Sequence, residues 1–133
     1  MRTRLLLAAL ALPLSMPATA ALAPGAVAPD FTASGALAGK AFTVNLKAAL
    51  KKGPVVLYFF PAAFTQGCNV EAKAFADASD QFKAADATVI GLTAGNVDQL
   101  AKFSSEHCAN KFAVAAASDT VIAGYDVRLK NKD

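Results

Sequence analysis

The stretch YFFPAAFTQGCNVEAKAF, residues Tyr58–Phe75, decides the fold of this 133-residue chain. Its first three residues complete the continuous apolar run PVVLYFF, residues 54–60, which is typical of a strand buried on both faces of a sheet. The run breaks at Pro61, and a short loop of small residues leads into an amphipathic helix predicted to begin at about Gly67 or Cys68. Cys68 is therefore expected in the first turn of a helix that follows a core strand.

This position favours a reactive thiol at Cys68. The first turn of a helix has unpaired backbone N–H groups and carries the positive end of the helix dipole, so it favours an anion. A thiolate is such an anion, and cysteines placed there tend to have a lowered pKa and to be nucleophilic. A buried, inert cysteine is the alternative, because free cysteines are often simply packed in a core.

The residues around Cys68 favour chemistry over packing. Pro61, Thr65, Cys68 and Glu71 give the pattern P-x-x-x-T-x-x-C-x-x-E. The Thr65 hydroxyl could act on the sulfur or on the group that it attacks, Pro61 fixes the loop, and Glu71 lies on the same side of the helix as Cys68. The pattern resembles the active-site signature of the peroxiredoxins (AhpC/TSA superfamily). PAAFTQGCNVEA is especially similar to the peroxiredoxin Q (bacterioferritin comigratory protein) and peroxiredoxin-5-like branches.

This resemblance extends from Ala28 to about Leu129 and implies an α/β domain of thioredoxin type, with a central, mostly parallel sheet flanked by helices. It implies a thiol-dependent peroxidase that reduces hydrogen peroxide and small organic hydroperoxides. Cys68 would be the peroxidatic cysteine, supported by Pro61 and Thr65. The implied reductant is a thioredoxin-like or glutaredoxin-like protein or a small thiol, and no metal, haem or flavin cofactor is implied.

The second cysteine departs from the pattern of the family. Many peroxiredoxin Q proteins place a resolving cysteine where this chain has Lys73, and others place it near the position of Ser104. Cys108 lies one turn further along that predicted helix, and we expect it to resolve Cys68 if the helix end unwinds. A packed thiol without a role is the alternative. His107, beside it, is expected to be a solvated surface residue.

The family arginine is the other departure. Peroxiredoxins use an arginine on a later strand to stabilise thiolate and peroxide. Arg128 is the only arginine after the N-terminal segment, and its position matches poorly, so it is expected on the surface. The family would continue beyond Asp133 with two more strands and a helix. We therefore expect a C-terminally truncated domain, a monomer or weak dimer, whose unpaired sheet edge invites association.

The first twenty residues have the pattern of a cleavable export signal. Arg2 and Arg4 precede the apolar segment Leu5–Leu14, and Ala18–Ala20 forms an A-x-A cleavage site. The apolar segment is too short to span a bilayer. Cleavage would leave residues 21–133 as one domain in a bacterial periplasm or a similar space, without a membrane anchor. A retained N-terminal anchor is the alternative.

Charge and cysteine spacing exclude several classes of function. The chain has 13 basic and 10 acidic residues, and it is nearly neutral without the two arginines of the signal, which gives no basis for nucleic-acid binding. With two cysteines, no C-x-x-C and one histidine, neither a thioredoxin-type motif nor a zinc site is indicated. A structural disulfide, a thiol–disulfide oxidoreductase and a non-catalytic truncated binding module remain as alternatives.

Hydrophobic periodicity and turn residues predict the other elements. A single helix is predicted from Cys68 to about Ala84, with an inward apolar stripe at Val70, Ala74, Phe75, Ala78 and Phe82. The further predictions are a strand in GKAFTVNL, a helix capped by Asn45, a strand at Ala87–Thr93, a helix starting at Asn96 or Asp98, a strand in FAVAAASD, and a last helix capped by Asp119.

Overall fold

The computed structural model describes residues 21–129, so the predicted export signal lies outside the described residues. In chain order the elements are β1 (Thr32–Leu37), β2 (Lys40–Asn45), α1 (Leu46–Leu50), β3 (Val55–Phe59), α2 (Gln66–Asp77), α3 (Ser79–Ala84), β4 (Thr88–Thr93), the 3-10 helix η1 (Val97–Gln99), α4 (Leu100–Glu106), β5 (Ala113–Ala116) and α5 (Asp119–Gly124). None of the helices in this range is both long and apolar enough to cross a membrane.

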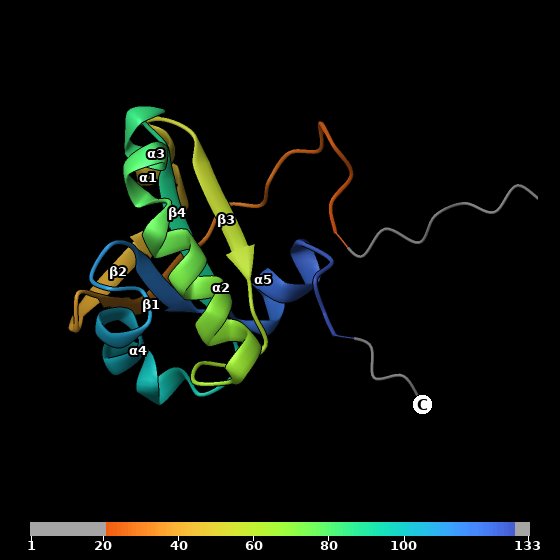
Figure 1. Cartoon of the computed structure of the whole chain (residues 1–133). Coiled ribbons are helices and arrows are strands. Elements are labelled where there is room, and N and C mark those ends of the chain that lie inside the picture. Colours follow the sequence, from red (N-terminus) through yellow and green to blue (C-terminus); the bar gives the residue numbers. More distant parts are fainter. Residues whose placement is uncertain (1–20, 130–133) are drawn as a thin grey trace, which may run out of the picture.

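The strands form one five-stranded sheet in the order β2-β1-β5-β4-β3 (Figure 1). The three strands β5, β4 and β3 run parallel, as the predicted strand–helix–strand order requires. The hairpin of β1 and β2 joins this parallel unit antiparallel, through β1 and β5. The expected α/β architecture of thioredoxin type is confirmed.

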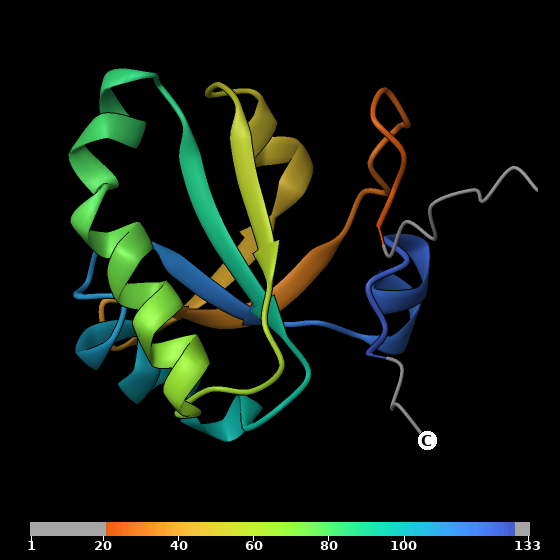
Figure 2. The same cartoon turned by 45° about the vertical axis from the view of Figure 1, so that its right-hand side comes forward.

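Helices cover both faces of the sheet (Figure 2). α2, α3 and α4 pack on one face, and α1, α5 and the segment before β1 pack on the other. The side chains of β3 divide between the faces with the period of two that a strand imposes: Tyr58 points to the α2 side, whereas Leu57 and Phe59 point to the α5 side. Both faces of the strand are covered, as predicted, but only Tyr58 is buried and the other four residues are half-buried, since β3 lies at the edge of the sheet. The strand leads into the loop that precedes the helix of Cys68.

The predicted single helix after Cys68 is in fact two helices. α2 ends at Asp77, and Ala78 (φ −86°, ψ 3°) separates it from α3. The predicted apolar stripe is wrong at its first positions, because Val70 is 66% exposed and Ala74 is also exposed. The residues that α2 buries are small and four apart, Cys68, Ala72 and Ala76, which lets the helix approach the sheet closely. Phe75 and Phe82 pack against this core as predicted.

Two smaller differences concern β1 and the last helix. β1 (TASGAL) was not predicted, since its residues have little strand preference and its place is set by pairing with β2. The Asn45 cap is confirmed, because the Ala48 N–H donates to its side-chain oxygen at 2.7 Å. The last helix begins one residue early: Ser118, and not Asp119, caps it by accepting from the Val121 N–H at 3.2 Å.

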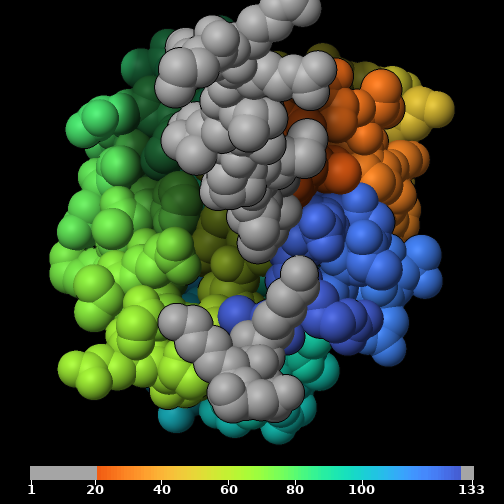
Figure 3. Space-filling model, turned by 90° about the vertical axis from the view of Figure 1, so that its right-hand side faces the viewer, coloured from red at the N-terminus to blue at the C-terminus, as the bar shows by residue number. Residues whose placement is uncertain are grey.

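The outer side of β3 has no strand partner within residues 21–129. The Phe60 N–H donates to the Leu92 carbonyl at 3.0 Å, so alternate backbone groups point toward β4. The remaining backbone groups of β3, those of Val55, Leu57 and Phe59, therefore point outward. Figure 3 shows this side of the molecule, with α2 (green) and α5 (blue) on either side of the strand. This is the unpaired edge expected from the sequence.

Candidate active site

Cys68 is the third residue of α2 and is only 6% exposed. Thr65 occupies the N-cap position with extended backbone angles, but its side chain does not cap the helix. The first hydrogen bond of the helix joins the Asn69 N–H to the Thr65 carbonyl at 2.9 Å. The N–H groups of residues 66–68 therefore have neither an intrahelical partner nor a side-chain cap, which leaves backbone donors beside the sulfur.

Thr65 closes the loop in this structure. Its hydroxyl donates to the Ala62 carbonyl at 3.1 Å, three residues earlier. The side chain is exposed, so a rotation about χ1 would free the hydroxyl for another acceptor. Its predicted action on the sulfur or on a bound group remains a prediction, and so does the predicted support from Glu71, an exposed residue one turn further along α2.

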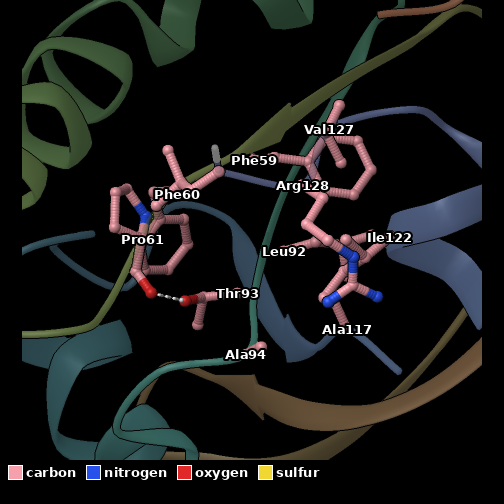
Figure 4. Close-up of a pocket in the computed structure, with 11 residues that line it drawn as sticks. Phe59, Phe60, Pro61, Leu92, Thr93, Ala94, Ala117, Ile122, Val127 and Arg128 are labelled. Carbon is pink, nitrogen blue, oxygen red and sulfur yellow. Dashed lines mark hydrogen bonds between the residues drawn. The ribbon is translucent and has the colours of Figure 1, made fainter. Parts of the chain in front are cut away.

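The loop between β3 and α2 is held by the last residue of β4 and by the segment that follows this strand. The Thr93 hydroxyl donates to the Pro61 carbonyl at 3.0 Å (Figure 4), and the Asn96 side-chain amide donates to the Ala63 carbonyl at 2.8 Å. The Ala63 N–H in turn donates to a backbone carbonyl of the same segment, that of Gly95, at 3.2 Å. These contacts fix the position of Pro61 and with it the direction in which α2 begins, whereas the predicted support of Cys68 by Pro61 remains a prediction.

Gly95 permits this close approach of the two segments. A Cβ atom at this position would lie 2.5 Å from both the Ala62 Cβ and the Pro61 carbonyl oxygen. Real Cβ atoms do not approach other heavy atoms so closely, so a side chain here would push the loop away from β4. The loop and α2 would then lose the position that the hydrogen bonds give them.

Phe64 is the strained residue of the loop. Its φ of 63° lies in the left-handed region, which costs a bulky side chain about 1–3 kcal/mol. Its ring packs edge-on against Phe103 (5.5 Å between centroids) and His107 (5.2 Å). These contacts hold the turn that starts α2. The expectation that His107 is a solvated surface residue is wrong, because it is half-buried against these rings.

Cys108 lies just after α4 and is fully buried. Its N–H donates to the Phe103 carbonyl at 3.2 Å, and burial raises the pKa of its thiol to about 12. Both cysteines belong to the same core cluster, on the α2 side of the sheet, and neither is in a disulfide. The structure thus brings Cys68 and Cys108 to one face without joining them, and the resolving role of Cys108 remains a prediction.

Arg128 lies on the surface, where the sequence predicted it. Its guanidinium pairs with the Asp119 carboxylate at 3.2 Å, and the side chain is 60% exposed. It lines a cavity of about 270 Å³ that Pro61 and Thr93 also line (Figure 4). Cys68 does not line this cavity, so Arg128 is not placed beside the sulfur.

Three residues that shape the site were not identified as site residues from the sequence. Thr93 and Asn96 act through hydrogen bonds to residues 32 and 33 positions away, which no local pattern reveals. Tyr58 belongs to the same core cluster as both cysteines, and a feature of the sequence could have indicated its importance. It is one of only two tyrosines in the chain, and it places a hydroxyl in an otherwise apolar strand.

The site offers one sulfur, backbone donors beside it and a nearby hydroxyl. This is an arrangement suited to nucleophilic attack and to stabilising a leaving oxygen. Among residues 21–129, no three His, Cys, Asp or Glu side chains gather in a way that could hold a metal ion.

Comparison with known proteins assigns this arrangement to a family. The sequence model of the AhpC/TSA family matches residues 24–132. This chain belongs to the AhpC/TSA family. A "putative peroxiredoxin" of Mycobacterium tuberculosis is 36% identical over 84 residues, which cover 63% of this chain and 54% of that protein. The chloroplastic peroxiredoxin Q of Triticum aestivum is 40% identical over 83 residues, 62% of this chain and 36% of that protein.

Among solved structures, this AhpC/TSA-family chain is similar to peroxidoxin BcpB from Mycobacterium tuberculosis. The TM-score is 0.69 at 31% identity, and the match covers 81% of this chain and 68% of that one. The chain spans about half the length, or less, of the curated relatives named above. The resemblance to peroxiredoxin Q expected from the residues around Cys68 is confirmed.

Proposed function

We propose that this AhpC/TSA-family protein is a thiol-dependent peroxidase that reduces hydrogen peroxide and small organic hydroperoxides through Cys68. The observation that carries the proposal is the position of Cys68 beside the uncapped N–H groups of α2, after a loop that is pinned to the end of β4. The names of the relatives, peroxiredoxins of the Q and bcp types, support the same chemistry.

The proposed reaction uses the sulfur as a nucleophile. The Cys68 thiolate attacks one oxygen of the peroxide, the O–O bond breaks, and the second oxygen leaves as hydroxide or alkoxide. The new S–O bond makes Cys68 a sulfenic acid. The free N–H groups at the start of α2 stabilise the charge, and the Thr65 hydroxyl, once it leaves the Ala62 carbonyl, reaches a substrate oxygen.

Cys108 is the proposed resolving cysteine. A disulfide requires the two Cα atoms to come within about 7 Å, so the segment around Cys108 has to rearrange. Ala109 (φ 49°) and Asn110 (φ 61°) follow it in left-handed conformations, which makes this turn a place where the chain opens at low cost. A thioredoxin-like or glutaredoxin-like protein, or a small thiol, would then reduce the disulfide.

The N-terminal residues support a proposed location outside the cytoplasm. The basic start, the apolar segment and the A-x-A site at Ala18–Ala20 are the three parts of an export signal. We propose cleavage after Ala20 and function in a periplasm or a similar space. N-terminal sequencing of the protein recovered from its natural host tests this, with Ala21 as the expected first residue.

The activity is tested by the intact mass of reduced protein after one equivalent of hydrogen peroxide. We expect the wild type to lose two hydrogen atoms, which shows a Cys68–Cys108 disulfide within one molecule. The Cys108→Ser variant should instead gain one oxygen atom on Cys68. The Cys68→Ser variant should stay unchanged over the same time.

Other outcomes separate the alternatives. No rapid change in the wild type, or the same change in Cys68→Ser, contradicts the peroxidase and leaves a binding module. Faster reduction of insulin disulfides than of peroxide would indicate a thiol–disulfide oxidoreductase on the same fold. Gain of oxygen by the wild type without disulfide formation would keep the peroxidase and remove Cys108 from the cycle.

A further inference from the structure

The hydroxyl of Tyr58 is a buried polar group without a hydrogen-bond partner. Tyr58 lies in β3, is 9% exposed and points to the α2 side of the sheet. Its hydroxyl makes no hydrogen bond within the described residues. Buried polar groups in native proteins are almost always paired, and an exception calls for an explanation, of which a redox or catalytic role is one.

Packing fixes where this hydroxyl lies. The Tyr58 ring stacks on Phe75 of α2, with 4.3 Å between ring centroids, and lies edge-on to Phe112 at 6.1 Å. Phe112 follows Cys108 by four residues, so the ring contacts both the helix that starts with Cys68 and the segment that holds Cys108. Gly91 of β4 makes room for it, since a Cβ there would lie 2.8 Å from the Tyr58 Cζ. The hydroxyl therefore has little freedom to find another partner.

Tyr58 shares its core cluster with both cysteines. Burial raises the pKa of Tyr58, and the negative charges of Cys108, Glu71 and Cys68, in that order, raise it further. The phenol consequently keeps its proton, so its hydroxyl can donate a hydrogen bond, and a nearby acceptor would stabilise it. A neutral thiol accepts hydrogen bonds weakly, whereas a thiolate accepts them strongly. Glu71 is exposed, whereas both cysteines share the buried core cluster of Tyr58, so a sulfur that has lost its proton is the candidate partner of the hydroxyl.

We propose that Tyr58 is a positioning residue for resolution, whose hydroxyl donates a hydrogen bond to the sulfur of Cys108 when that sulfur becomes a thiolate. This inference rests on the proposed function and concerns its second step. In that step Cys108 releases its proton, and its sulfur attacks the sulfur of the Cys68 sulfenic acid. The S–S bond forms, the S–O bond breaks, and hydroxide leaves and takes up the proton to become water.

The chemistry of Cys108 explains why a donor is needed. A fully buried thiol with a pKa of about 12 is almost entirely protonated at neutral pH and attacks slowly. A hydrogen bond to the charged form favours that form. Losing such a bond should slow the attack roughly 10- to 100-fold. The peroxide step at Cys68 precedes this event and should not depend on it.

The test compares Tyr58→Phe with wild type in a single turnover, following sulfenic acid and disulfide separately by quenched mass spectrometry. We expect sulfenic acid to form at the wild-type rate within roughly twofold, and the disulfide to form at least roughly 10-fold more slowly. The reduced variant should unfold at the same urea concentration as wild type, or a higher one, because an unpaired hydroxyl has been removed.

Tyr125→Phe is the matched control. The only other tyrosine hydroxyl is paired, since Tyr125 donates to the Pro29 carbonyl at 2.6 Å. This variant should unfold at a lower urea concentration and form the disulfide at the wild-type rate. A Tyr58→Phe variant that forms the disulfide as fast as wild type overturns the inference, and so does one that slows both steps equally, which would be a general structural effect.

A second oxidant separates this inference from the proposed function. Diamide first forms an adduct with one cysteine, and the other cysteine then displaces it to give the same disulfide. If wild-type Cys68 does not react with peroxide, the peroxidase proposal fails, yet Tyr58→Phe should still slow the diamide-driven disulfide. Absence of a Cys68–Cys108 disulfide with both oxidants, or equal rates for variant and wild type with diamide, overturns the role of Tyr58.

Discussion

Cys68 and Cys108 lie in the same core cluster, yet their surroundings differ. Cys68 begins a helix, has free backbone donors beside it, and follows a loop fixed by contacts from β4. Cys108 follows the end of a helix, is surrounded by apolar side chains, and has a thiol pKa raised to about 12 by burial. The fold thus places one sulfur beside backbone donors at the start of a helix and keeps the other protonated in an apolar core.

The largest expected contrast between the two cysteines concerns the first oxidation. Cys68→Ser should lower the rate of peroxide consumption at least roughly 1,000-fold, because the nucleophile is lost. Cys108→Ser should leave the first turnover within about threefold of wild type, because Cys108 acts only afterwards. Stopped-flow measurement of peroxide loss in a single turnover checks both variants. Similar losses in the two would show that the cysteines are not divided in this way.

The rate at which Cys108 is alkylated tests how strongly the fold protects this thiol. In a Cys68→Ser background, iodoacetamide should modify native Cys108 at least roughly 1,000-fold more slowly than the same residue in urea, since the thiol pKa rises from 9.0 to about 12 on folding. The native rate should increase about tenfold per pH unit through neutral pH. Equal labelling of native and unfolded protein would mean that Cys108 is open to solvent.

The pH dependence of the free energy of unfolding should reflect the ionisation of Cys108. Cys108 has a higher pKa in the folded protein, so above about pH 9 the unfolded chain loses a proton that the native state keeps. Stability must then fall as pH rises, by up to about 1.4 kcal/mol per pH unit. Urea unfolding between about pH 8 and pH 10 measures this slope. Cys108→Ala should have a shallower slope than wild type, and an unchanged slope would contradict the assignment.

The smallest expected effect concerns the hydrogen bonds that hold the loop between β3 and α2. Thr93→Val removes the hydrogen bond to the Pro61 carbonyl and should lower the free energy of unfolding by about 1 kcal/mol. It should also slow the reaction of Cys68 a few-fold, because α2 begins from a looser loop. Thr43→Val, an exposed change in β2 away from the loop, is the control and should leave the peroxide rate unchanged. Equal rates for Thr93→Val and wild type would show that the loop does not depend on this bond.

Local sequence predicted the surroundings of Cys68 better than those of Cys108. Pro61, Thr65 and Cys68 fall within one strand–loop–helix unit, so their spacing alone places them together. The position of Cys108 relative to Cys68 depends on how α4 packs, and the contacts of Thr93 and Asn96 with the loop depend on pairing between distant segments. Such contacts arise from tertiary structure, which has no local signature.

The face that α2 buries was also beyond local sequence. Alternating alanines in NVEAKAFADA allow more than one inward stripe, and the larger Val70 suggested the wrong one. The sheet selects the stripe with small side chains, Cys68, Ala72 and Ala76, since only these permit close packing. The strand β1 was missed for a related reason, because pairing with β2 and β5, and not residue preference, makes it a strand.

The open outer side of β3 has a practical consequence for handling the protein. Within residues 21–129 the amide and carbonyl groups of Val55, Leu57 and Phe59 have no strand partner, and we expect two molecules to pair through them non-covalently as the concentration rises. Under oxidising conditions, such a pair would resemble a cross-linked dimer in size-exclusion chromatography. Redox experiments therefore belong in dilute solution, with a denaturing, non-reducing gel to tell the two species apart.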